Sequence, residues 1–206
     1  MKKTIIEFGG IDGSGKSTQI KKIHDYFLKQ ELNVIIPNSC VDFSELYPQT
    51  LSERKEWYKT ANPEEIVKAN LSGAKLCNDY CLDINCDLIL LDRGFVTNKS
   101  SSVARMMSRK KMDFLSSERF IDSIASDLGY KKIEDLNIIY SASINTIKSR
   151  IKYPITKSFE DYLQDFCYSI KQVSSDKNNR IILSDNRGKE DVFEETKRTI
   201  NYLLMT

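Results

Sequence analysis

The residues best suited to chemistry lie near the N-terminus, where Gly10 to Ser17 read Gly-Ile-Asp-Gly-Ser-Gly-Lys-Ser. This is the pattern G-x-x-x-x-G-K-[ST], placed between an apolar run and a helical pattern. Glycines let backbone N–H groups approach an anion closely, and the positive end of the helix dipole lies at the same point. The residues expected to bind the phosphates of a nucleotide are Gly10, Gly13, Ser14, Gly15, Lys16, Ser17 and Thr18. In such a loop the lysine reaches the β- and γ-phosphates, and the serine hydroxyl ligates Mg²⁺.

Asp92 and Arg93 form a second pair that could do chemistry, because they end the apolar run that starts at Asp87. A continuous apolar run is typical of a central parallel strand. Ligands of open α/β sheets bind at the carboxyl ends of the strands, so we expect this pair to face the same crevice as the phosphate-binding loop. The carboxylate could hold Mg²⁺ or its water shell, and the guanidinium could clamp a phosphoryl group. A strand-end salt bridge is the structural alternative.

A third candidate is the short basic connection at about 151–158, which joins two helical patterns and is flanked by Arg150 and Lys157. We expect it to be a lid that closes over the phosphates, excludes water and brings positive charge to the transferring group. An ordinary basic connection between helices is the alternative.

The segment from 37 to about 62 is long and weakly periodic, and such connections are more often binding segments than filler. Arg54, Trp57 and Tyr58 are therefore candidates for a substrate pocket, with a solvated amphipathic helix as the alternative. The polar stretch from Thr97 to Lys111 carries four cations, most of which are expected on a solvated face. The acceptor-binding segment is expected within about 37–110.

Short apolar strands alternate with helices along the rest of the chain. Strands are predicted at the N-terminus and at 34–36, 88–91, 136–140 and 180–183, and a proline-started helix is predicted from Asn62 to about Ile84. This order predicts a three-layer P-loop NTPase fold of the α/β class, in which a parallel five-stranded sheet is flanked by helices and carries a short lid. The 206 residues fit one domain, 1–206.

Composition narrows the class of partner. With 31 basic and 29 acidic residues the net charge is only +2, so no electrostatic footprint for nucleic acid or a membrane surface is present. No stretch approaches the roughly 20 apolar residues of a membrane span, and we expect a cytoplasmic protein with a small anionic partner. The five cysteines are expected to be free thiols. Zinc is disfavoured because the chain has no C-x-x-C spacing and one histidine.

Four segments resemble the thymidylate kinase family of nucleoside monophosphate kinases, and the resemblance runs over most of the chain. Residues 10–18, including the internal acid Asp12, look like that family's P-loop, and Leu91-Asp92-Arg93 looks like its Asp-Arg motif. Arg150 with Lys157-Ser158-Phe159-Glu160 is similar to its lid and following helix. Ser184-Asp185-Asn186-Arg187, before Glu190-Asp191-Val192, looks like the loop that packs against the donor adenine.

The resemblance implies ATP-dependent phosphoryl transfer with Mg²⁺, most simply from ATP to dTMP. It implies that Asp12 meets an acceptor hydroxyl, that Arg93 binds the acceptor phosphate and that Asp92 organises the metal together with Ser17. It further implies that Arg150 neutralises charge on the transferring group. The donor adenine would lie near Asn186 and Arg187, and Phe95 would stand near the acceptor. It also favours a homodimer.

Several positions differ from the family pattern, and they lie on the acceptor side. Where the family has Arg-Glu-Pro-Gly-Gly-Thr after the second strand, this chain has Pro37-Asn38-Ser39-Cys40-Val41-Asp42. Gly9 replaces the usual Glu, Gly94 replaces the usual aromatic residue, and Ser72-Gly73-Ala74-Lys75 replaces an arginine-bearing pattern. The acceptor could therefore be a nucleoside or another small hydroxylated metabolite, with Asp12, Glu45 or Glu53 as the base. A regulatory ATPase is the alternative from another class.

Overall fold

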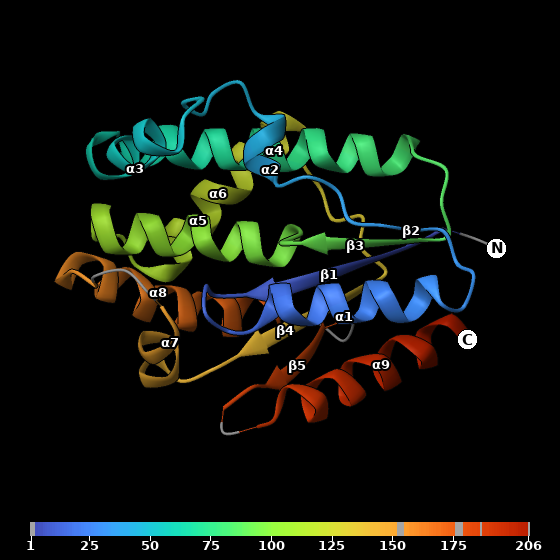
Figure 1. Cartoon of the computed structure of the whole chain (residues 1–206). Helices are drawn as coiled ribbons and strands as arrows, with labels where there is room; N and C mark the ends of the chain where they lie inside the picture. Colours follow the sequence, from blue (N-terminus) through green and yellow to red (C-terminus); the bar gives the residue numbers. More distant parts are fainter. Residues whose placement is uncertain (1–2, 152–154, 176–178, 186, 206) are drawn as a thin grey trace.

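The computed structural model describes residues 3–151, 155–175, 179–185 and 187–205 (Figure 1). Five strands form one parallel sheet in the order β2-β3-β1-β4-β5. The strands are β1 Thr4–Gly10, β2 Val34–Ile35, β3 Leu88–Asp92, β4 Leu136–Ser141 and β5 Asn179–Leu183. The prediction of a parallel five-stranded sheet flanked by helices is confirmed.

The helices follow the strands as helical crossovers require. They are α1 Lys16–Leu28, α2 Cys40–Phe43, α3 Leu51–Thr60, α4 Pro63–Asp83, α5 Phe95–Lys110, α6 Phe114–Leu128, α7 Ile144–Arg150, α8 Lys157–Val173 and α9 Lys189–Met205. The start of α4 is as predicted, because the Asn62 side chain accepts a hydrogen bond from the Glu64 N–H and Pro63 occupies the first turn.

One helical segment lies where the sequence has a solvated amphipathic helix as the alternative, and another, α6, is not predicted from the sequence. The segment after β2 contains α2 and α3, and α3 begins at a capping box in which Thr50 and Glu53 each accept from the other's backbone N–H. Helix α6 follows α5, with Asp113 as its N-cap and Gly129 in the left-handed conformation after its last turn.

One face of the sheet is covered by α1 and α9 (Figure 1). Ile6, Phe8 and Ile138 from the sheet are fully buried there against Ile23 of α1 and Ile200 of α9. Because β1 and β4 alternate side chains between two buried faces, both strands are apolar almost throughout.

The opposite face is covered by α4, α5 and α8 (Figure 1). Ile139 of β4 packs with Phe166 of α8, and Ile89 of β3 packs with Cys77 and Cys81 of α4. All five cysteines are free thiols, and these two fill the core as small apolar residues. Within the described residues, no three His, Cys, Asp or Glu side chains are grouped to hold a metal ion.

The strand register places the candidate site residues after β1 and β3 at the same edge of the sheet. Phe8 pairs with Asp92, and Gly10 pairs with Tyr140, so the loop after β1 and the Asp92-Arg93 pair leave the sheet side by side. This is the carboxyl edge of the sheet, where open α/β folds bind ligands. Among the described residues, no helix is long and apolar enough to cross a membrane.

Candidate active site

The loop between β1 and α1 has the backbone conformation of an anion cradle. Gly10, Gly13 and Gly15 all have positive φ values, of 126°, 82° and 102°. A Cβ on Gly10 would stand 2.4 Å from the Tyr140 carbonyl oxygen, whereas a Cβ on Gly15 would meet nothing within 4 Å. Gly10 therefore allows β1 to approach β4 closely, while Gly15 leaves open space at the N-terminus of α1. The Ser14 hydroxyl is buried there without a hydrogen-bond partner among the described residues.

Lys16 is the buried cation of this loop. Its side chain folds back so that Nζ donates to the Ile11 carbonyl oxygen at 3.2 Å, and the residue is only 6% exposed. Burial, reinforced by the nearby Arg93 charge, lowers the pKa of Lys16 to about 8. Among the described residues no carboxylate forms an ion pair with this ammonium, so a phosphate could bind it. Ser17 and Thr18 are exposed on the first turn of α1.

Asp12 and Arg93 join the P-loop to the end of β3. The Arg93 guanidinium forms an ion pair with the Asp12 carboxylate, and this charge holds the pKa of Asp12 below its usual range. Arg93 has φ 76°, a left-handed conformation that costs energy for a residue other than glycine. Beside it, Asp92 Oδ1 is buried without a hydrogen-bond partner in the described part of the chain.

Two buried glutamates hold the N-terminus of α5, directly after Arg93. Glu7 of β1 accepts hydrogen bonds from the N–H groups of Val96 at 3.0 Å and Thr97 at 2.9 Å. Glu134, which precedes β4, accepts from the Phe95 N–H at 2.6 Å. Gly94, at the N-cap, has no side chain to offer, so the two carboxylates satisfy the first three N–H groups of the helix.

A cavity opens beside Arg93, between α4, α5 and α8. Its lining side chains come from segments far apart in the sequence, namely Tyr47, Tyr58, Ile66, Val67, Asn70, Arg93, Ser101, Ser102, Arg105 and Tyr162. Asn70 donates to the Ser102 hydroxyl at 3.2 Å, and this hydrogen bond joins two polar side chains of the cavity wall. We call this space the acceptor cavity, after the acceptor that the sequence predicts to bind near Arg93; acceptor binding here stays a prediction.

Arg105 is the second cation of the acceptor cavity. Its guanidinium lies 5.2 Å from the ring centre of Tyr58 and 5.1 Å from that of Tyr162, so it is held between two aromatic faces. Its hydrogen-bond donors are used by no residue that the structure describes, in contrast to Arg93, which is paired with Asp12. Most cations of this stretch are expected on a solvated face, and Lys110 and Lys111 are exposed. Arg105 is an exception, because Tyr162 of α8 and Tyr58 of α3 lie against it.

Arg150, the last residue of α7, lies over the P-loop. Its Nη1 donates to the Gly13 carbonyl oxygen at 3.2 Å, and its Nη2 donates to the Ser184 carbonyl oxygen at 3.0 Å. The structure therefore brings Arg150 to the phosphate-binding loop. Of the predicted lid at 151–158, residues 152–154 lie outside the described residues, and Lys157 pairs with Asp161 in the first turn of α8.

Of the two residues predicted to lie near the donor adenine, the structure describes only Arg187. Asn186 lies outside the described residues. Arg187 donates to the Leu183 carbonyl oxygen at 3.2 Å and pairs with Glu195 of α9, so its guanidinium links the ends of β5 and α9.

Three predicted substrate residues lie near the acceptor cavity without lining it. Arg54 donates to the Pro48 carbonyl oxygen at 2.6 Å and supports the loop before α3. Trp57 packs on the ring of Tyr47, 5.3 Å away, behind the cavity wall. Phe95 packs on Tyr130 in the core between α5 and α6. Their contacts with substrate stay a prediction.

Sequence reasoning missed Glu7, Asn70, Arg105, Glu134 and Tyr162. A signal existed for α5, since Asn98, Ser101, Ser102 and Arg105 recur at helical spacing within an otherwise apolar face. Buried polar side chains on such a face indicate a site. Glu7 carried a signal too, because it is an acid within an apolar strand.

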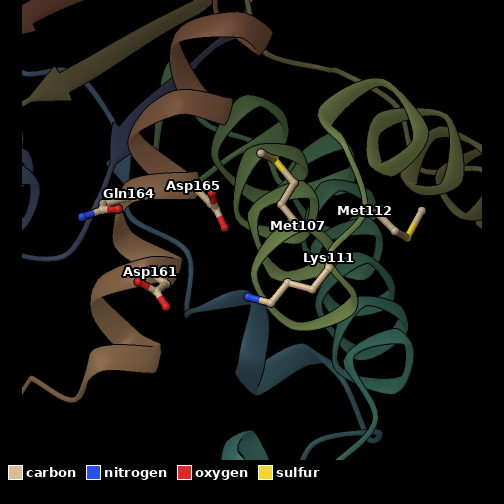
Figure 2. Close-up of a pocket in the computed structure, with 6 residues that line it drawn as sticks. All are labelled: Met107, Lys111, Met112, Asp161, Gln164 and Asp165. Carbon is tan, nitrogen blue, oxygen red and sulfur yellow. The ribbon is translucent and has the colours of Figure 1, made fainter.

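A second cavity lies at the far end of α5 (Figure 2). Its six lining residues include Lys111, whose side chain extends toward the α8 acids Asp161 and Asp165, while Met112 points away from α8 (Figure 2). None of the predicted site residues lines it, so the P-loop and the acceptor cavity form the candidate active site.

Comparison with known proteins finds relatives named thymidylate kinase. No family model matches the chain. A thymidylate kinase of Thermosipho melanesiensis is 24% identical over 97% of this chain and 98% of its own length. A thymidylate kinase of Thermoanaerobacter sp. (strain X514) is 53% identical over 36 residues, which are 18% of either chain. The match with this second relative therefore spans less than a fifth of its length.

Solved structures agree with the fold. Thymidylate kinase from Candida albicans superimposes with a TM-score of 0.66 at 16% identity, covering 97% of this chain and 92% of that one. Deoxyadenosine kinase from M. mycoides with bound dCTP gives 0.68 at 16% identity, covering 97% and 100%. Thymidylate kinase from Ehrlichia chaffeensis gives 0.61 at 17% identity, covering 96% and 98%.

The fold and the site define a P-loop kinase, a phosphotransferase with a nucleotide-binding loop. Within that class the chain is thymidylate kinase-like, and the resemblance to that family seen in its motifs is confirmed by a full-length relative and by several structures.

Proposed function

We propose that this chain transfers the γ-phosphoryl group of ATP to a nucleoside monophosphate, with dTMP as the first candidate. The observation that carries the proposal is the ion pair between Asp12 of the P-loop and Arg93 at the mouth of the acceptor cavity. It joins a phosphate-binding loop to a cavity whose entrance carries a guanidinium, the group best suited to a phosphate dianion.

The charges of the acceptor cavity favour a phosphorylated acceptor over a free nucleoside. Arg93 and Arg105 both line it, and only Arg93 has a carboxylate partner among the described residues. An anionic acceptor would neutralise the excess positive charge, whereas a neutral nucleoside would not. Arg93 could exchange Asp12 for the acceptor phosphate, and Asp12 would then be released toward an acceptor hydroxyl.

ATP and Mg²⁺ fit the residues present. The open space at Gly15, the unpaired Ser14 hydroxyl and the buried Lys16 ammonium all suit phosphate oxygens. Ser17 and the unpaired Oδ1 of Asp92 are oxygen ligands of the kind that Mg²⁺ or its water shell prefers. When bound, Mg²⁺ would neutralise charge on the phosphate oxygens.

The chain's own residues would then hold the phosphoryl group and orient the acceptor. Lys16 would hold the transferring phosphoryl group, and Arg150 would leave the Gly13 and Ser184 carbonyl oxygens to approach it from α7. Arg93 would orient the acceptor phosphate for in-line attack.

A nucleoside kinase is the second candidate. It is favoured by the likeness to deoxyadenosine kinase and by residues 37–42, which offer no arginine. ADP release from ATP and Mg²⁺ across nucleoside monophosphates, free nucleosides and sugar-like alcohols separates the two candidates. Lys16→Met and a reaction without acceptor are the controls.

Stimulation by dTMP or another monophosphate supports the proposal. Stimulation by free nucleosides alone replaces it with the second candidate. ADP release that no acceptor changes contradicts both and favours a regulatory ATPase.

A further inference from the structure

The strongest feature outside the phosphate and acceptor contacts is the pair of buried carboxylates behind Arg93. Glu7 is fully buried and Glu134 is 5% exposed. Both converge on Gly94: a Cβ at that position would stand 2.1 Å from Glu134 Oε1 and 2.9 Å from Glu7 Oε2. Any residue other than glycine would collide with the pair.

A second glycine, Gly9, makes room for Glu7 and for Thr97. A Cβ on Gly9 would stand 2.5 Å from Thr97 Oγ1 and 2.9 Å from Glu7 Oε1. Thr97 Oγ1 also accepts from the Gly10 N–H at 3.2 Å, which ties α5 to the start of the P-loop. Gly9 and Gly94 are two of the positions at which this chain departs from the thymidylate kinase pattern. Glu7 lies against both of them, and Glu134 lies against Gly94.

We propose that the buried carboxyl groups of Glu7 and Glu134, which converge on Gly94, together act as the positioning element of Arg93, with one of the two protonated at neutral pH. The pair binds the first three N–H groups of α5, and Arg93 is connected to that turn through Gly94 alone. Since Arg93 has a left-handed backbone that is costly for a residue with a side chain, rigid surroundings must maintain it. The inference rests on the proposed function in so far as Arg93 binds the acceptor.

Both carboxyl groups are buried and both approach Gly94, so holding a negative charge on each of them at once is costly. Burial, followed by the charge of Glu134, raises the pKa of Glu7 to about 7, and burial also raises the pKa of Glu134. The titratable groups that face the pair are Lys16 of the P-loop, Cys77 and Cys81 of α4, and Tyr130 and Lys132 of the segment before β4.

Two consequences follow for pH. Between pH 4.5 and about 7, Glu7 is protonated in the native chain but ionised in the unfolded chain. The free energy of unfolding should therefore fall as the pH rises through that interval. Above about pH 7 two buried negative charges would repel each other at the start of α5, and Arg93 would lose its position. The acceptor kcat/KM should therefore fall above neutral pH.

The test compares wild type with Glu134→Gln, in which an amide stands in for the protonated acid. Asp113→Asn is the matched control, since Asp113 caps α6 by the same kind of hydrogen bond, to the Ser116 N–H at 2.9 Å. Between about pH 7 and pH 8, below the range in which Lys16 loses its proton, we expect Glu134→Gln to lose the decline of acceptor kcat/KM, while Asp113→Asn keeps it. Glu134→Ala should raise the acceptor KM at least tenfold and change the dissociation constant of ATP less than threefold.

An infrared measurement tests the pair without any activity. Wild type near neutral pH should show the carbonyl stretch of a protonated, buried carboxylic acid. In Glu134→Gln this band should be weaker at the same pH, because the charge that helps to raise the pKa of Glu7 is removed. Absence of that band in wild type, or identical pH profiles for wild type and Glu134→Gln, would overturn the inference. Failure of every acceptor with the infrared band present would instead overturn the proposed function alone.

Discussion

Removal of the Arg105 side chain should weaken acceptor binding and leave ATP binding intact. In the free protein the guanidinium is stabilised by the rings of Tyr58 and Tyr162, at 5.2 and 5.1 Å, and no counter-ion among the described residues offsets its charge. Arg105→Ala therefore costs little folding stability, about 1–2 kcal/mol for the two ring contacts. The larger effect of Arg105→Ala is a loss of binding free energy for the acceptor.

The magnitude follows from the hydrogen bonds that an acceptor would make. A hydrogen bond to a charged group contributes about 1.5–3 kcal/mol, and about 1.4 kcal/mol corresponds to a tenfold change in affinity. One such bond lost from a half-buried cavity predicts an acceptor KM about 10- to 100-fold higher. Arg105→Lys should lie between wild type and Arg105→Ala, because it keeps the charge but loses the planar fork.

Steady-state ADP release at saturating ATP, with the acceptor varied, measures this effect. Arg109→Ala is the matched control, since Arg109 lies one turn further along α5, donates to the Tyr58 and Lys59 carbonyl oxygens at 3.3 Å and does not line the cavity. If Arg105→Ala and Arg109→Ala change the acceptor KM equally, or if neither changes it threefold, the assignment of this cavity to the acceptor is refuted.

Other predictions concern the phosphate side of the site. Lys16→Met should abolish phosphoryl transfer while the fold persists; residual turnover above a few per cent would contradict the role of Lys16. Because the pKa of Lys16 is lowered to about 8, ATP affinity measured by calorimetry should decline above about pH 8 as the ammonium loses its proton, and a flat profile in that range would contradict this. Arg150→Ala should reduce turnover by roughly 10³-fold or more, the scale of arginine stabilisation in phosphoryl transfer, with ATP affinity changed less than tenfold; the opposite pattern would assign Arg150 to binding. Chelation of divalent ions should stop the reaction and added Mg²⁺ should restore it, whereas activity in the chelator would remove the metal role of Asp92.

The sequence by itself determined the phosphate side of this protein. Its glycines, Lys16 and the start of α1 are contiguous, so their geometry is local and a short motif specifies it. Asp92 and Arg93 were predictable for a related reason: an apolar run ending in polar residues marks the carboxyl edge of a parallel strand, and all such edges meet. The alternation of strands and helices then sufficed for the fold class.

Only the tertiary structure decided the acceptor side. Periodicity shows which helix face is apolar, but it does not show that a polar residue on that helix is covered by another element. Arg105 became a cavity residue because Tyr162 of α8 and Tyr58 of α3 close over it, and these segments are far apart in the sequence. Likewise, Glu7 and Glu134 are 127 positions apart in the chain numbering and meet because β1 and β4 are neighbours in the sheet. Long-range contacts of this kind depend on packing in three dimensions, which no local pattern of residues encodes.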